Sequence, residues 1–151
     1  MPLFEGSVKW EGKSILSIES YYEVINYLGH SPGLSPELTG YENLDLYKTI
    51  SGARKLAMDL TEAISICEAK NIAFKPIKSL SAGEKQKIVL ARMLMFKCPL
   101  WVFDEPFNTL DAKTQRILEN QIDKHVFDGG TVVLTSHQPF STTCARQSIA
   151  I

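Results

Sequence analysis

Two apolar segments, each followed at once by polar residues, constrain the fold of this chain more than any other feature of its sequence. Leu100–Phe103 is an uninterrupted apolar run that ends at Asp104 and Glu105. Thr131–Thr135 is a second such run, and a serine and His137 follow it. Short continuous runs of this kind are typical of strands buried on both faces, as in parallel sheets. Helical patterns alternate with these strands, so the sequence predicts an α/β fold built on a parallel sheet.

The polar residues after these two strands are the first candidates for a functional site. Ligands of open parallel sheets bind outside the carboxyl ends of the strands, where Asp104, Glu105 and His137 are expected. Adjacent carboxylates suit a magnesium nucleotide, because Asp104 can hold the ion through water and Glu105 can deprotonate an attacking water. Taken alone, an Asp-Glu-Pro turn without a ligand explains the carboxylates equally well, and a lone histidine at a strand end is more often structural.

Capping sequences locate the starts of several helices. Thr39–Glu42 and Ser81–Glu84 both follow the capping-box pattern, and Asp111 suits the position that caps a third helix. Together with apolar spacing, these signals predict helices at about 43–50, 54–70, 81–96 and 111–125. Free backbone N–H groups at the start of the helix that follows Ser81 suit an anion, although a well-capped helix without a ligand explains that segment alone better.

Further strands are expected near both ends of the chain. Residues 6–16 have the pattern of a short hairpin, in which Val8 and Trp10 alternate with polar neighbours around a glycine turn. Val24–Leu28 is a short apolar run that stops at a glycine, which predicts a strand followed by a loop. Residues 148–151 are expected to form the last strand.

Length, charge and cysteine spacing exclude several other classes of protein. The 151 residues are enough for one domain. Lys plus Arg number 16 and Asp plus Glu number 17, so the net charge of −1 gives no support to nucleic-acid binding. No apolar run approaches the roughly 18 residues of a membrane-spanning helix. The three cysteines lack a C-x-x-C spacing, which argues against a zinc or dithiol site.

The order of these elements resembles that of the ATP-binding cassette (ABC) transporter ATPases. Five elements recur in the family's order: Leu80–Gln86, the strand that ends in Asp-Glu-Pro, Asn108–Asp111, the next helix, and the strand that ends at His137. The resemblance implies a P-loop NTPase (RecA-like) α/β core plus the ABC helical subdomain, incomplete at the N-terminus. Residues 1–151 would form one partial domain with three parts: a hairpin and strand remnant of the core (1–29), a loop and helical subdomain (30–80), and the signature helix, Walker B and switch strands of the core (81–151).

The resemblance implies a role for each residue that matches a family motif. The catalytic residues would be Glu105, the base at the end of the Walker B strand, and His137, the switch histidine near the γ-phosphate; Asp104 would hold Mg²⁺. The signature loop, which closes over ATP held by the opposite subunit, is matched by Ser81, Ala82, Gly83 and Glu84. Asn108–Asp111 matches the loop that contacts the partner subunit, so Asp111 is also expected beside the nucleotide.

A narrower resemblance concerns the segment Tyr27–Leu44, which is similar to the ATP-binding subunits of haem exporters in c-type cytochrome maturation. His30 stands where most cassettes carry a glutamine and is counted among the nucleotide-binding residues, and His137 is followed by Gln138 as in that group. The resemblance implies ATP and Mg²⁺ as ligands, a dimer of ATP-binding subunits and an integral-membrane transporter subunit as partner. The expected location is peripheral, at the cytoplasmic face of the inner membrane or at the matrix face of the mitochondrial inner membrane.

One motif of the family is not found in the sequence. A cassette ATPase needs the phosphate loop G-x-x-x-x-G-K-[ST]. Gly12-Lys13-Ser14 imitates its end, but Gly6 lies one residue too far upstream and Ser7 stands where the first glycine belongs. We therefore expect the chain to start downstream of the phosphate loop, to lack the strand beside the His137 strand, and to hydrolyse ATP poorly or not at all alone. The alternatives are a cassette that serves another transporter and a truncated, non-hydrolysing interaction module.

Overall fold

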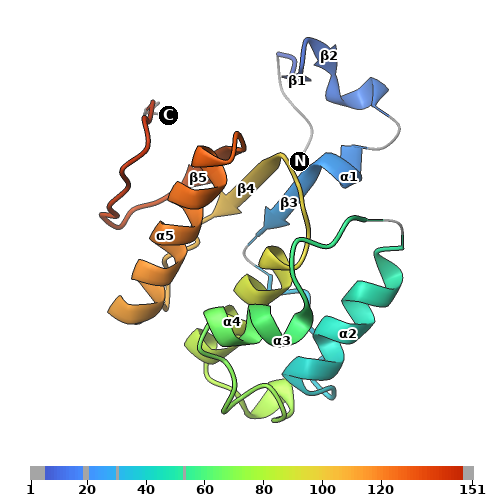
Figure 1. The fold of residues 1–151 in the computed structure, drawn as a ribbon, viewed down its shortest axis with the longest axis vertical. Helices are drawn as coiled ribbons and strands as arrows, with labels where there is room; N and C mark the ends of the chain where they lie inside the picture. The colour runs from blue at the N-terminus through green and yellow to red at the C-terminus, as the bar shows by residue number, and fades with distance from the viewer. Residues whose placement is uncertain (1–5, 19–20, 30, 53, 148–151) are drawn as a thin grey trace.

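The computed structural model describes residues 6–18, 21–29, 31–52 and 54–147 (Figure 1). His30 and the expected strand at 148–151 lie outside the described residues. The main helices are α2 (Gly40–Ile50), α3 (Leu60–Ile66), α4 (Ala82–Leu94) and α5 (Ala112–Phe127). Three short elements accompany them: η1 (Ile15–Ser17), α1 (Tyr21–Val24) and η2 (Ile77–Ser79).

A three-stranded parallel sheet forms the centre of the molecule, as the apolar runs predict. Its strands are β3 (Ile25–Leu28), β4 (Leu100–Asp104) and β5 (Thr131–Thr135), in the order β3-β4-β5. Leu28 is paired with Phe103, and Asp104 with Thr135. The carboxyl ends of all three strands therefore meet at one edge of the sheet, which is where the polar residues of the sequence are found.

The exposure of β5 differs from the sequence-based expectation. The run was expected to be buried on both faces, but Val133 is 55% exposed, while Val132 and Leu134 pack against the core. Among the described residues β5 pairs only with β4, so it is an edge strand with one open face. An apolar run does not reveal which of its faces a neighbour covers, and for β5 the prediction was wrong.

The predicted hairpin is confirmed near the N-terminus. β1 (Lys9–Trp10) pairs antiparallel with β2 (Lys13–Ser14). The two turn residues between them, Glu11 and Gly12, have positive φ angles of 49° and 78°, the backbone twist that two-residue hairpins favour. The Gly12-Lys13-Ser14 sequence thus belongs to a hairpin turn and its second strand.

Both capping boxes are confirmed, but one helix is much shorter than expected. α3 covers Leu60–Ile66, whereas the apolar spacing predicted a helix over about 54–70. The residues before α3 bond elsewhere: Ala57 N–H donates to the carbonyl of Met95 (2.8 Å), and Asp59 then caps the helix. A long-range backbone pairing, which local periodicity cannot reveal, sets this helix start.

The helices divide into two groups around the sheet. α2 and α3 pack on α4, and α4 reaches β3, while α5 packs on β5 (Figure 1). The core that joins these layers includes fully buried Leu44 of α2, Ile88 of α4 and Phe103 of β4. Within the described part of the chain, none of the helices combines the length and apolar character that crossing a bilayer needs.

Candidate active site

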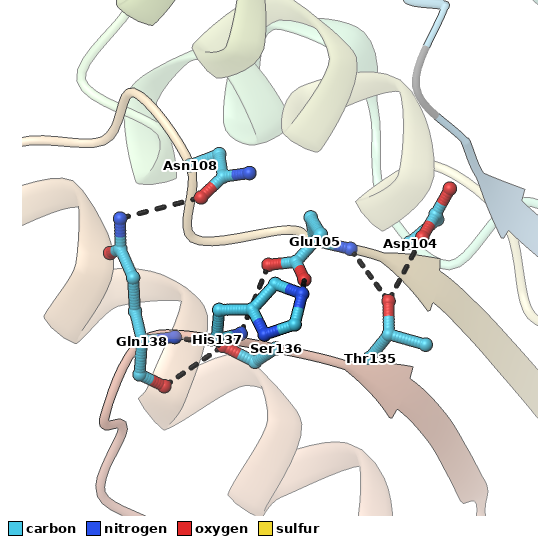
Figure 2. Close-up of polar contacts among 7 residues, drawn as sticks. All are labelled: Asp104, Glu105, Asn108, Thr135, Ser136, His137 and Gln138. Carbon is cyan, nitrogen blue, oxygen red and sulfur yellow. Dashed lines mark hydrogen bonds and ion pairs between the residues drawn. The ribbon is translucent and has the colours of Figure 1, made fainter. Parts of the chain in front are cut away.

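The turn after β4 carries the two adjacent carboxylates, and a threonine of β5 fixes both of them. The hydroxyl of Thr135 donates to Asp104 Oδ1 (2.9 Å) and accepts the backbone N–H of Glu105 (3.1 Å), as Figure 2 shows. Glu105 has a φ of 51°, a conformation that costs free energy in a residue other than glycine and that collects at functional sites. The turn thus presents Asp104 and Glu105 at the carboxyl ends of the strands.

His137 lies against Glu105. Its backbone N–H donates to Glu105 Oε2 (3.2 Å), and its Nε2 is 3.3 Å from Glu105 Oε1 (Figure 2). The histidine side chain is 96% exposed and the glutamate side chain 20% exposed. The structure therefore brings together two residues that are 32 positions apart in the sequence. A carboxylate that is paired with an imidazole can bind and orient a water molecule, and it can accept a proton from that water.

A second contact joins the same two loops. Gln138 Nε2 donates to Asn108 Oδ1 (3.3 Å), and the Ser136 hydroxyl donates to the carbonyl of Gln138 (2.9 Å), as Figure 2 shows. The loop after β5 is thus fastened to the loop after β4 at two points, through Glu105 and through Asn108.

The start of α4 packs against the far end of the loop after β4. A Cβ atom on Gly83 would lie 2.8 Å from the carbonyl oxygen of Thr109, closer than a carbon can approach without movement of the backbone, so the contact requires glycine. The Ser81 hydroxyl and amide both donate to Glu84 Oε2 (2.9 and 2.8 Å). These bonds lower the pKa of Glu84 below its ordinary value, and they hold the serine in the capping box.

A cleft of about 290 Å³ separates α4 from the carboxyl ends of the strands. Ala82 from α4 lines it together with Asp104 and Glu105. The residues that line the cleft are Leu28, Gly29, Pro32, Ala82, Lys85, Gln86, Asp104, Glu105, Asn108 and Thr109. Among the predicted site residues, Ala82, Asp104 and Glu105 line the cleft. Ser81, Gly83 and Glu84 flank Ala82 at the start of α4 but are not among the lining residues, and neither are Asp111 and His137.

Asp111 is engaged inside its own chain. Its carboxylate accepts the backbone N–H of Thr114 (2.7 Å) as the N-cap of α5, and it lies 3.3 Å from Lys87 Nζ. The bonds from Thr114, together with the weaker contribution of Lys87, lower the pKa of Asp111 from 3.8 to about 2. The predicted cap is confirmed, and it ties α5 to α4.

The donor set beside the cleft suits magnesium better than a transition metal. No group of three or more His, Cys, Asp or Glu that could hold a metal ion exists among the described residues. Asp104 is exposed, and the Thr135 hydroxyl occupies one of its carboxylate oxygens. Magnesium accepts one or two protein carboxylates and completes its shell with water and phosphate, so Asp104 fits this ion.

Comparison with known proteins shows the family of this chain. The sequence model of the family described as "ABC transporter" matches residues 2–108, more than half of the chain. The chain belongs to the ABC transporter family. It is 40% identical over 138 residues to the cytochrome c biogenesis ATP-binding export protein CcmA of Haemophilus influenzae, and the match covers 89% of this chain and 64% of that protein. The chain therefore spans a little under two thirds of this relative.

Solved structures of ABC cassettes have the same fold. The dimeric structure of MJ0796, a bacterial ABC transporter cassette, matches with a TM-score of 0.73 and 26% identity over 89% of this chain and 64% of that chain. A structure of the same cassette in a post-hydrolysis state bound to ADP and Pi matches with a TM-score of 0.70 and 25% identity, with the same coverage. The predicted P-loop NTPase fold with a parallel sheet is thus confirmed.

The sequence analysis does not single out two residues of this region, Thr135 beside the carboxylates and Lys85 in the cleft. Thr135 was treated only as the end of a strand, although its position beside Ser136 and His137 places it at the same sheet edge. Lys85 lines the cleft from α4, and its place in the second turn of a capped helix is the signal that was available. The remaining contacts, such as Gln138 with Asn108, depend on the pairing of β4 with β5.

Proposed function

We propose that these residues form the ATP-hydrolysing part of an ABC transporter subunit that drives haem export for c-type cytochrome maturation. The contact of Glu105 with His137 beside Asp104 is the observation that carries the hydrolytic role. The substrate and the membrane partner are proposed from the similarity to the cytochrome c biogenesis export protein of Haemophilus influenzae. An ABC transporter of another substrate would share the site and differ in its partner.

The residues of the sheet edge divide the chemistry among them. Glu105 is the general base: it orients an attacking water and takes its proton. His137 holds Glu105 through two contacts and would bind the γ-phosphate of ATP. Asp104, fixed by the Thr135 hydroxyl, would hold Mg²⁺. When bound, the ion neutralises charge that develops on the phosphates.

The first turn of α4 is proposed to serve the dimer. Ser81, Ala82, Gly83 and Glu84 surround the start of a helix, where backbone N–H groups and the helix dipole favour a phosphate. In the proposed dimer they close over ATP held by the partner, and the loop that ends at Asp111 contacts the partner beside the nucleotide. His30 is assigned to the nucleotide on the family resemblance alone. The dimer is supported by the dimeric form of the MJ0796 cassette.

The phosphate loop is proposed to come from a segment outside these 151 residues. The sequence holds no G-x-x-x-x-G-K-[ST], and Gly12, Lys13 and Ser14 lie in a hairpin. The open edge of β5 offers a place for the strand that precedes such a loop. We propose that the chain alone hydrolyses ATP poorly or not at all. We also propose the division into 1–29, 30–80 and 81–151, and a peripheral location on the membrane that carries the transporter subunit.

A hybrid protein tests the hydrolytic role. Residues 6–151 would be joined to the preceding region of the Haemophilus influenzae relative, and ATP turnover and binding would be measured with and without Glu105→Gln. We expect turnover to fall about 10²- to 10⁴-fold in this variant, as for loss of a general base, while ATP binding persists.

The control is Glu62→Gln, the same change at an exposed glutamate of α3. Turnover that survives Glu105→Gln undiminished would contradict the general-base assignment. A hybrid that binds ATP but does not hydrolyse it would favour the interaction module, and co-purification with a haem-handling membrane subunit tests the transporter assignment.

A further inference from the structure

The segment that follows the switch histidine lies along one face of α5. Residues 139–144, here named the C-terminal strap, lie beside this helix without regular secondary structure. Four pairs of residues join the strap to the helix through hydrogen bonds: Gln115 with Pro139 (3.2 Å), Glu119 with Ser141 (2.8 Å), Asp123 with Thr143 (2.7 and 3.0 Å), and Asp123 with Cys144 (3.4 Å). The helix residues are four apart, and the first three bonded strap residues, Pro139, Ser141 and Thr143, are two apart.

This spacing matches the strap to the helix. Four helical residues rise about 6 Å, and two residues of a chain span up to about 6.6 Å when extended. One contact per helical turn can therefore repeat along the strap without a change of direction. The donors also match the acceptors: the proline, which has no N–H, is held through its carbonyl, while Ser141 and Thr143 donate their backbone N–H groups to carboxylates.

A residue between the bonded positions of the strap contacts the loop after β4, which carries Glu105. Phe140 stacks on Phe107, with ring centroids 5.0 Å apart and planes at 19°. Phe107 is 1% exposed and lies two residues after Glu105. The strap is thus wedged between α5 and the loop after β4.

The position of His137 depends on its backbone more than on its side chain. The side chain is 96% exposed, so packing contributes little to its placement. Within the described ranges, its backbone N–H and its Nε2 both contact Glu105. The backbone is fixed before His137 by β5, and after it only by Gln138 and the strap.

We propose that Glu119 and Asp123 are positioning residues for His137: they dock the strap on α5 and so hold the histidine backbone against Glu105. Gln115 supports both, because its amide donates to Glu119 Oε1 (3.1 Å) as well as to the strap. An effect of these residues on turnover rests on the proposed function, whereas the positioning itself can be measured without ATP.

Amide hydrogen exchange of the 151-residue chain tests the positioning. In a Glu119→Ala, Asp123→Ala double variant, the amides of Ser141 and Thr143 lose their acceptors, and we expect the amide of His137 to exchange about tenfold faster than in the unaltered chain. Glu119→Gln keeps an acceptor oxygen and is expected to retain most of the protection. Asn120→Ala, at an exposed residue of the same helix, is the matched control and should change nothing.

Two outcomes would overturn the proposal. One is loss of protection at Ser141 and Thr143 with unchanged exchange at His137. The other is an equal acceleration in Asn120→Ala, which would trace the effect to helix stability. Ser141→Pro gives a second route, because it removes a strap donor without altering α5. If His137 exchanges in that variant as in the unaltered chain, the proposal fails even where the double variant does not fold.

Turnover separates this proposal from the proposed function. In the hybrid protein, Asp123→Ala is expected to lower kcat about tenfold, while KM for ATP changes less than about twofold, since the residue acts on the reacting geometry and not on binding. An unaltered kcat would overturn the role in turnover. If the unaltered hybrid does not hydrolyse ATP, the proposed function fails, and hydrogen exchange still decides whether the strap positions His137.

Discussion

The two ends of the three-stranded sheet differ in one respect: Asn26 near the amino end is buried and paired, whereas Asp104 and His137 at the carboxyl end are exposed. Asn26 of β3 is 4% exposed; its amide donates to the carbonyl of Met93 (2.8 Å), and its Oδ1 accepts from Arg54 (3.2 Å). Asp104 and His137, at the other end, are exposed. Buried polar groups with full partners stabilise a fold, whereas exposed ones with spare oxygens remain available to a ligand.

Arg54 shows how the amino end is closed. Its guanidinium also donates to the carbonyl of Ile25 (3.3 Å) and to Cys98 Sγ, and it lies 4.8 Å from the centre of the Phe96 ring. Burial raises the pKa of the Cys98 thiol in spite of this contact, so the cysteine is a neutral packing residue. One side chain thus links the loop before α3, the end of α4 and the sheet. The carboxyl end is linked by exposed side chains such as Thr135 and Gln138, and it opens into the cleft.

An asparagine-to-alanine change at each end of the sheet is expected to give the largest difference in the free energy of unfolding. Asn26→Ala removes two buried hydrogen bonds and leaves a cavity, so we expect a loss of about 2 kcal/mol in the free energy of unfolding. Asn108→Ala removes an exposed amide and is expected to change it by less than about 0.5 kcal/mol. Urea denaturation of both variants measures the two free energies of unfolding. Equal losses would remove the distinction between a structural end and a functional end.

A smaller difference is expected within β5 itself. Thr135→Val keeps the shape of the side chain but removes the hydroxyl that holds Asp104 and the amide of Glu105. We expect a loss of about 1 kcal/mol in the free energy of unfolding, and faster hydrogen exchange at the Glu105 amide. Thr131→Val, at the exposed amino end of the same strand, is the control. A Glu105 amide that stays protected in Thr135→Val would show that the turn does not need the hydroxyl.

Local signals predicted the elements of this fold, and contacts between distant residues account for the errors. The capping boxes at Thr39 and Ser81 depend on hydrogen bonds three residues apart, so the sequence reveals them directly. The shortened α3 and the open face of β5 depend on partners far along the chain, which no local pattern contains.

The contacts of the site also divide into those that the sequence predicts and those that depend on packing between distant residues. The meeting of Glu105 with His137 could be predicted, because parallel strands bring their carboxyl ends to one edge. Their exact partners could not: Thr135 and the strap residues act through contacts that exist only once β5 and α5 have packed. The roles of Ser81 and His30 in binding a nucleotide stay predictions.

The smallest expected effect is the loss of stability at acid pH that Asp111 causes. It tests whether Asp111 is a structural residue beside the site. Its pKa in the folded chain is about 2, below the ordinary 3.8, because the backbone N–H of Thr114 is bonded to the carboxylate and Lys87 lies nearby. A lowered pKa in the folded state adds stability that is complete above about pH 4 and is lost as the pH falls toward 2. The charge contributes only about 0.5 kcal/mol at this exposed helix end, because solvent screens it and the protonated side chain still caps. Urea denaturation of the unaltered chain and of Asp111→Asn should therefore give free energies of unfolding that differ at pH 7 and converge near pH 2. A difference that stays constant over this range would mean that the charge of Asp111 contributes nothing and that the cap acts by hydrogen bonding alone.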